Sequence, residues 1–196
     1  MHLGGTVFSC KYETCIMICC ALRAAQGQYC TPGMEARKCS AGTFNPLTGS
    51  QSVTSCLACL PGWACTEQGL AAPNKQCAEG HFCISGASSE EPANEWSEGG
   101  GICKKGFFCP KGSISARPCS SGKYCSQEKA KAPTGNCSAG HYCAHGATDQ
   151  RSSLTFYPND CPSSVIQGIC PPGSVCPEGS AFPYKCPAGE SRPASS

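Results

Sequence analysis

The residues of this chain best suited to chemistry are its cysteines, because they recur at one spacing. The pattern Cys-x-x-Gly-x-x-Cys occurs six times, and the chain has 21 cysteines in 196 residues. Thiols in such a pattern can form disulfides, bind a metal ion or take part in redox exchange. Incomplete copies of the pattern lie at 24–30, 39–45 and 186–192. The complete copies contain Cys59 and Cys65, Cys77 and Cys83, Cys103 and Cys109, Cys119 and Cys125, Cys137 and Cys143, and Cys170 and Cys176.

Metal binding is the first alternative to disulfides. Cys56 and Cys59 have the spacing of zinc ligands, but a structural zinc site needs two such pairs. The dominant interval of six residues also differs from the clustered spacing of a thiolate metal store. His81 and His141 occupy equivalent repeat positions that other units fill with Phe, Lys or Ser. We interpret that position as a half-exposed structural one, and we expect no metal site and no cofactor.

Catalysis is the second alternative. It needs a nucleophile with an orienting base, or paired carboxylates in a cleft, and the sequence has neither pattern. A redox role for Cys56 and Cys59 would require a βαβ context, which the sequence lacks. We therefore expect no catalytic residues and no enzyme activity.

The composition favours disulfides over an ordinary hydrophobic core. Leu, Ile, Val and Phe together number only 25, and the net charge of +2 is too low for a disordered chain of this composition. Two pairings close short loops: within a unit, as in Cys77 with Cys83, or between units, as in Cys65 with Cys77. The central glycine permits a reversal that brings positions six apart into disulfide range, which favours the first pairing. Cys161 or Cys186 is the expected unpaired cysteine.

Glycines and aromatic residues indicate the elements that position these cysteines. The glycine three residues after the first cysteine position predicts a positive φ angle in each unit. In six units Phe or Tyr precedes the second cysteine position, where its ring can cover a neighbouring disulfide. We expect a small disulfide-rich fold, an elongated tandem array of short β-ribbon and turn modules with little regular secondary structure. Only residues 126–132 have the pattern for a turn or two of helix.

A longer period groups the units into blocks. Cys59 and Cys119 lie 60 residues apart, and Cys119 and Cys186 lie 67 apart, because the stretch after Cys143 is longer than its counterpart. We divide the chain into an N-terminal segment of unknown role at 1–23, a partial cysteine-rich block at 24–58, blocks of three units at 59–118 and 119–185, and the start of a further unit at 186–196.

The charge balance and the apolar runs exclude two classes of partner. Fifteen Lys and Arg residues against 13 Asp and Glu residues, without long runs, indicate no nucleic-acid partner. The longest apolar run, residues 15–22, has eight residues, whereas a membrane span needs roughly 20. We expect no membrane span in this chain, and we interpret the run as the candidate apolar region of a leader.

Residues 39–65, CSAGTFNPLTGSQSVTSCLACLPGWAC, resemble the ephrin-receptor-like cysteine-rich repeat, a relative of the EGF-like and tumour-necrosis-factor-receptor-like modules. The units that follow resemble the tandem arrays of this repeat in extracellular proteins of protists. The resemblance implies an extracellular or cell-surface location and a disulfide between Cys39 and Cys56. Receptors, adhesion proteins and structural proteins all use the module, so the resemblance does not select among them.

We expect a non-enzymatic structural element of an extracellular fibre, flagellar hair or cell-surface coat, whose partners are copies of itself or neighbouring chains. A ligand-binding or adhesion segment of a receptor ectodomain is the alternative. Asn136, in Asn136-Cys137-Ser138, matches the N-glycosylation pattern, so glycans are a further expected decoration. Modules with a small core leave aromatic side chains available for interfaces. These candidate contact residues are Trp63, Trp96, Phe107, Phe156, Tyr157 and Phe182.

Overall fold

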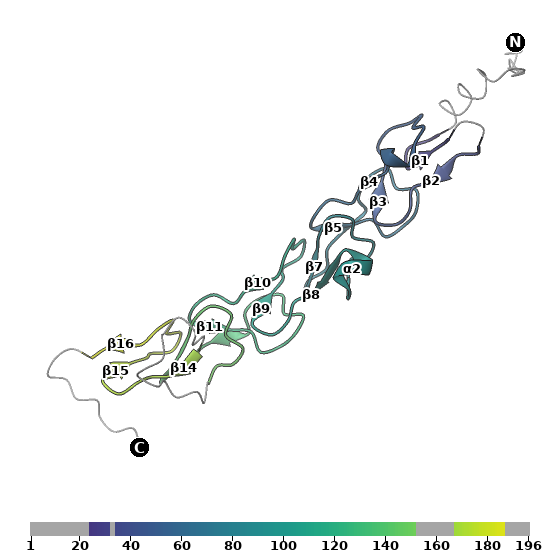
Figure 1. The fold of residues 1–196 in the computed structure, drawn as a ribbon. Coiled ribbons are helices and arrows are strands. Elements are labelled where there is room, and N and C mark those ends of the chain that lie inside the picture. The colour runs from purple at the N-terminus through teal and green to yellow at the C-terminus, as the bar shows by residue number, and fades with distance from the viewer. Residues whose placement is uncertain (1–23, 32–33, 152–166, 187–196) are drawn as a thin grey trace, which may run out of the picture.

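The computed structural model describes residues 24–31, 34–151 and 167–186. These residues form an elongated rod in which short ribbons follow one another in chain order (Figure 1). The segment at 1–23, the candidate contact residues Phe156 and Tyr157, and Cys161 lie outside the described residues.

The described residues contain sixteen short strands, which pair into eight antiparallel ribbons. In each ribbon, a strand inside one unit pairs with the strand directly before the first cysteine position of the next unit, so each ribbon joins two consecutive units. This array confirms the predicted fold class. The pairs are β1 (Gln28–Tyr29) with β2 (Arg37–Lys38), β3 (Thr43–Phe44) with β4 (Leu57–Ala58), β5 (Trp63–Ala64) with β6 (Lys75–Gln76), β7 (His81–Cys83) with β8 (Gly100–Ile102), β9 (Phe107–Phe108) with β10 (Arg117–Pro118), β11 (Lys123–Tyr124) with β12 (Gly135–Asn136), β13 (His141–Cys143) with β14 (Gln167–Ile169), and β15 (Ser174–Val175) with β16 (Tyr184–Lys185).

The helical segments lie elsewhere than the sequence predicts. Residues 126–132 form turns instead of a helix, because Lys129 has a φ of 57° and its N–H donates to the Cys103 carbonyl of the preceding unit. A 3₁₀ turn, η1, spans Val53–Ser55, and the short helix α2 spans Glu95–Glu98.

Seven disulfides join pairs of described cysteines. Six of them link the two cysteines of one Cys-x-x-Gly-x-x-Cys unit, with a sequence separation of 6 and Cα–Cα distances of 5.7–6.0 Å. This is the first of the two pairings weighed above. The seventh links Cys39 to Cys56, the pair that the family resemblance implies. Cys30 is also disulfide-bonded, and Cys186 is the free cysteine among the described residues.

The same four backbone hydrogen bonds connect each unit to the next. They recur at all seven junctions from the unit at 24–30 to the unit at 170–176. Two run between the central glycine of one unit and the two cysteine positions of the next unit. The other two run between the two cysteine positions of the first unit and the loop that follows the second cysteine position of the next unit. At one junction they are Cys137 N–H to Gly122 C=O, Gly122 N–H to Cys143 C=O, Cys125 N–H to Ala147 C=O, and Gly146 N–H to Cys119 C=O, at 2.8–2.9 Å.

The central glycines confirm the predicted backbone conformation. In all eight units that the structure describes, this glycine has a φ between 77° and 84°. The lack of a side chain at this position also matters for packing. At Gly62, for example, a Cβ would lie only 2.7 Å from the carbonyl oxygen of Gly112. The glycine therefore permits both the turn and the close approach of a loop from two units further along.

The core of the rod is a row of covered disulfides. The side chain directly before the second cysteine position packs on the disulfide of the following unit, as Phe44 does on the Cys59–Cys65 bond. Tyr142 packs in the same way on the next disulfide, and its ring also lies within 3 Å of the position that a Cβ on Gly168 would take. Burial raises the pKa of the Tyr142 hydroxyl above its ordinary value. These contacts confirm that aromatic rings cover neighbouring disulfides.

Asn45 replaces a cysteine in the unit that begins at Cys39. Its side chain is fully buried, and its Nδ2 donates to the Gln28 carbonyl at 2.9 Å and to the Ser50 hydroxyl at 2.8 Å. Its Oδ1 accepts from the Leu47 N–H at 3.1 Å. Because Cys39 is bonded to Cys56, hydrogen bonds hold the loops here, whereas a disulfide does so in the six complete units.

Substituting Lys129 with Gly should stabilise the protein by about 1 kcal/mol, because a left-handed backbone costs a non-glycine residue roughly that much. Lys129 is the described non-glycine residue with a positive φ, and the equivalent residue one block earlier is Gly69, with a φ of 80°. Urea denaturation of the oxidised protein measures the change. Lys129→Ala is the control, since it removes the charge but keeps the Cβ. An equal gain from both substitutions would show that the charge, rather than the backbone, sets the cost.

Candidate interaction surface

Two of the ribbons place a large aromatic side chain on the surface. Where the residue before the second cysteine packs on the next disulfide, as Ala64 does, its preceding neighbour lies on the opposite face of the strand and can face outward, although His81 at the same position in its unit is buried. Trp63 and Phe107 occupy this outward position and keep 36% and 37% of their surface exposed. The position thus explains why two large aromatic residues remain on the surface.

Helix α2 carries a third exposed aromatic residue. The Asn94 side chain caps the helix by accepting from the N–H groups of Trp96 and Ser97 at 3.0 and 3.3 Å, and Gly99 ends it with a φ of 72°. The carboxylate of Glu98 accepts from the Ala93 N–H at 2.6 Å. With the helix held in this way, Trp96 has 98% of its surface exposed. Asn94 and Gly99 are cap signals in the sequence that could have located this helix.

The glycines after α2 allow the chain to return closely against its own ribbon. A Cβ on Gly100 would overlap the Phe82 carbonyl oxygen, and one on Gly101 would lie 3.1 Å from the Phe82 ring. Phe82 and Gly101 are cross-strand partners in the ribbon β7–β8. The glycine therefore leaves room for the Phe82 ring to lie across the ribbon beside α2.

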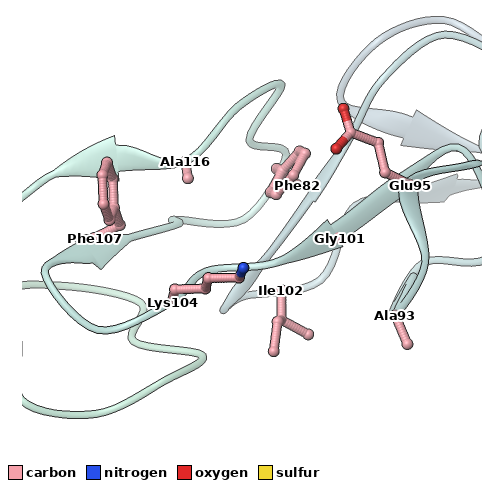
Figure 2. A pocket seen from close by; sticks show the side chains of 8 residues that line it. All are labelled: Phe82, Ala93, Glu95, Gly101, Ile102, Lys104, Phe107 and Ala116. Atoms are coloured by element: carbon pink, nitrogen blue, oxygen red, sulfur yellow. The ribbon is translucent and has the colours of Figure 1, made fainter.

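A groove of about 360 Å³ lies between this ribbon, α2 and the following unit. Figure 2 shows Glu95 towards one end and Phe107 with Ala116 towards the other, and the Phe82 ring lies between them. Lys104 extends from the side of Phe107 towards the middle of the groove (Figure 2). The lining is mostly apolar with one charged group from each side: Phe82, Ala93, Glu95, Gly101, Ile102, Lys104, Phe107 and Ala116.

Charge is unevenly distributed on the two sides of the groove. Residues 85–101 contain four Glu and no Lys or Arg, whereas residues 103–131 contain seven Lys or Arg and one Glu. The ion pairs between described residues are Lys75 with Glu90 at 3.9 Å and Lys131 with Glu79 at 3.3 Å. The charges of Glu95 and Lys104 consequently have no ion-pair partner among the described residues.

The structure brings only some of the predicted contact residues together. Phe107 lines the groove, and Trp96 lies on α2, which forms one side of it. Trp63 lies on a different ribbon, β5–β6. Phe182 is 59% exposed and packs on Tyr184 with ring centroids 5.1 Å apart, in the last described ribbon region. The charges of Glu95 and Lys104 were not singled out from the sequence, because only the fold places them in one groove.

Asn136 lies on β12 with an exposed side chain, and its Nδ2 donates to the Glu178 carboxylate at 3.1 Å. The middle residue of its glycosylation pattern, Cys137, is buried in the Cys137–Cys143 disulfide. The asparagine is therefore accessible, and its modification stays a prediction.

The histidines contact neighbouring polar atoms. His81 is only 4% exposed, which corrects the expectation of a half-exposed position, and its Nδ1 lies 3.2 Å from the Glu79 carbonyl. The Nδ1 of His145 lies 2.7 Å from the Ser121 hydroxyl. In the part of the chain that the structure describes, no three His, Cys, Asp or Glu side chains gather as a metal site would require.

No protein-family model matches this chain, and no curated protein matches it. Within the described ranges, no helix has the length and apolar character to cross a membrane. The disulfide content is typical of secreted or extracellular proteins. The chain is thus a disulfide-stapled repeat protein.

Proposed function

We propose that this protein is a non-enzymatic structural element of an extracellular fibre, flagellar hair or cell-surface coat. The observation that carries the proposal is the uniform junction: the same four hydrogen bonds repeat seven times along one rod. Repeat proteins of this kind are extended, and their stability is close to a sum of local terms. A rod with exposed aromatic side chains suits a building element that contacts its neighbours laterally.

The ephrin-receptor-like character of the units is part of this proposal. The Cys39–Cys56 disulfide is the pairing that the resemblance implies, and it supports the assignment. Glycans on Asn136 are compatible with an extracellular surface, since the side chain of this residue is exposed. A receptor ectodomain is the second candidate, and the state of assembly of the oxidised protein separates it from the structural one.

Oxidised native protein should form concentration-dependent assemblies, because the rod exposes Trp96 and Phe107 together with unpaired charges. Sedimentation velocity over a range of concentrations and negative-stain imaging measure this. Reduced and alkylated protein is the control, since it lacks the rod but has the same sequence. A monodisperse monomer that captures a soluble ligand tightly would favour the receptor function instead.

A further inference from the structure

We propose that the groove beside α2 is the centre of a two-fold contact between two copies of this chain that lie antiparallel. In this contact, α2 of each copy covers the unit at 103–109 of the other copy. The inference rests on the proposed function and deepens it, because it names the surface through which copies meet.

The apolar part of the argument concerns Trp96 and the groove next to it. Trp96 buries almost none of its surface in its own chain, being 98% exposed. The groove, which Phe82, Ile102 and Phe107 line, is bordered by Glu95, the residue before Trp96 on α2. Exposed tryptophans and apolar grooves mark protein contacts, and tryptophan is enriched among the residues that dominate binding energy. A contact between two copies would bury both features at once.

The charges select the second copy as the occupant, and they also select its direction. The acidic stretch at 85–101 and the basic stretch at 103–131 follow one another along the rod. A parallel neighbour in register would place acidic against acidic and basic against basic. An antiparallel neighbour, centred between the two stretches, places each acidic stretch against a basic one. Opposite potentials across an interface favour association and set its orientation.

The position of the groove makes this contact self-complementary. Glu95 and Lys104 line the groove from its two sides, on α2 and directly after Cys103. A two-fold axis through the middle of the groove brings Glu95 of each copy over Lys104 of the other. Such an axis repeats the same contact twice and closes after two copies. The paired rods can then form the lateral unit of a larger assembly.

Reversing the sign of one charge in the groove tests the antiparallel two-fold contact directly. Glu95→Lys and Lys104→Glu should each abolish dimer formation by the oxidised protein, because each places like charges together at two symmetric positions. An equimolar mixture of these two variants should form a heterodimer, since both contacts then join opposite charges. Native mass spectrometry of the mixture distinguishes the heterodimer by its mass. Glu91→Lys and Lys105→Glu make the same charge changes outside the groove lining and should affect dimerisation less.

Removal of the indole provides a second, independent readout. Trp96→Ala should raise the dimer dissociation constant at least about tenfold, because tryptophans of this kind are often dominant contact residues. Trp63→Ala is the matched control, since Trp63 is an exposed tryptophan outside the groove. Raising the salt concentration from about 0.1 M to about 1 M should also weaken the wild-type dimer, because it shortens the range of charge interactions from roughly 10 Å to roughly 3 Å.

The outcomes separate this inference from the proposed function. Wild-type assemblies that are unaffected by the Trp96 and charge variants would overturn the inference and leave the structural function standing. Two monomeric single variants that fail to pair in the mixture would also overturn it. A wild-type protein that stays monomeric at all concentrations would overturn both proposals. Each variant is compared only after its disulfide content matches that of the wild-type protein.

Discussion

Reduction of the disulfides should unfold the protein at a temperature at which the oxidised protein is stable. The disulfides join cysteines that are 6 or 17 residues apart. In the chain-entropy model, a disulfide that closes a loop of such a length stabilises the fold by about 2–3 kcal/mol. Seven such bonds between described cysteines therefore contribute on the order of 15 kcal/mol, which is as large as the whole stability of an ordinary domain. The buried core consists largely of these cysteines, so no separate apolar core would remain to hold the fold.

Circular dichroism and tryptophan fluorescence, to which Trp63 in its ribbon contributes, follow the loss of structure as reductant is added at constant temperature. Mass spectrometry after alkylation counts the thiols released. Oxidised protein treated with the alkylating reagent alone is the control, because it should keep its structure. A fold that persists with all of its thiols alkylated would contradict the view that disulfides are the main stabilising element.

Much of the fold could be predicted because its determinants are local in sequence. The Cys-x-x-Gly-x-x-Cys unit contains its own turn and its own disulfide, so the positive φ of the central glycine and the pairing of Cys77 with Cys83 depend on seven consecutive residues. The packing of Phe44 on the next disulfide depends only on strand alternation and on the adjacent unit. Short-range rules apply well to a structure that is built from short-range contacts.

The parts that could not be predicted depend on contacts between units. Lys129 adopts a left-handed backbone because its N–H bonds to the Cys103 carbonyl, and its own short segment has helix-forming composition. Composition alone gives no reason for Asn45 to serve in place of a cysteine. The groove brings Phe82, Lys104 and α2 together only because residues 84–99 fold back so that β8 pairs with β7. The spacing of these residues in the sequence does not predict that fold-back.

Replacing Gly122 with Ala should destabilise the rod by about 3–5 kcal/mol, whereas replacing Gly140 should cost only about 1–2 kcal/mol. Both glycines have a φ of 81°, so the strain of a left-handed alanine is the same at the two sites. They differ in their surroundings. A Cβ on Gly122 would overlap the carbonyl oxygen of Gly179, while no described atom lies within 4 Å of a Cβ on Gly140. The difference between the two variants therefore isolates the close approach of a loop two units away.

The overlap at Gly122 is with backbone, which cannot rotate out of the way as a flexible side chain can. Relief requires the loop at Gly179 to move, and that movement breaks the bond from its N–H to the Cys137 carbonyl. Because the junction bonds share these residues, hydrogen exchange should show faster exchange at the Gly179 and Cys137 amides in Gly122→Ala than in Gly140→Ala. Urea denaturation of the oxidised variants gives the free energies of unfolding. Equal losses at the two sites would mean that the glycines serve only the turn, and that packing between alternate units adds nothing to the stability of the rod.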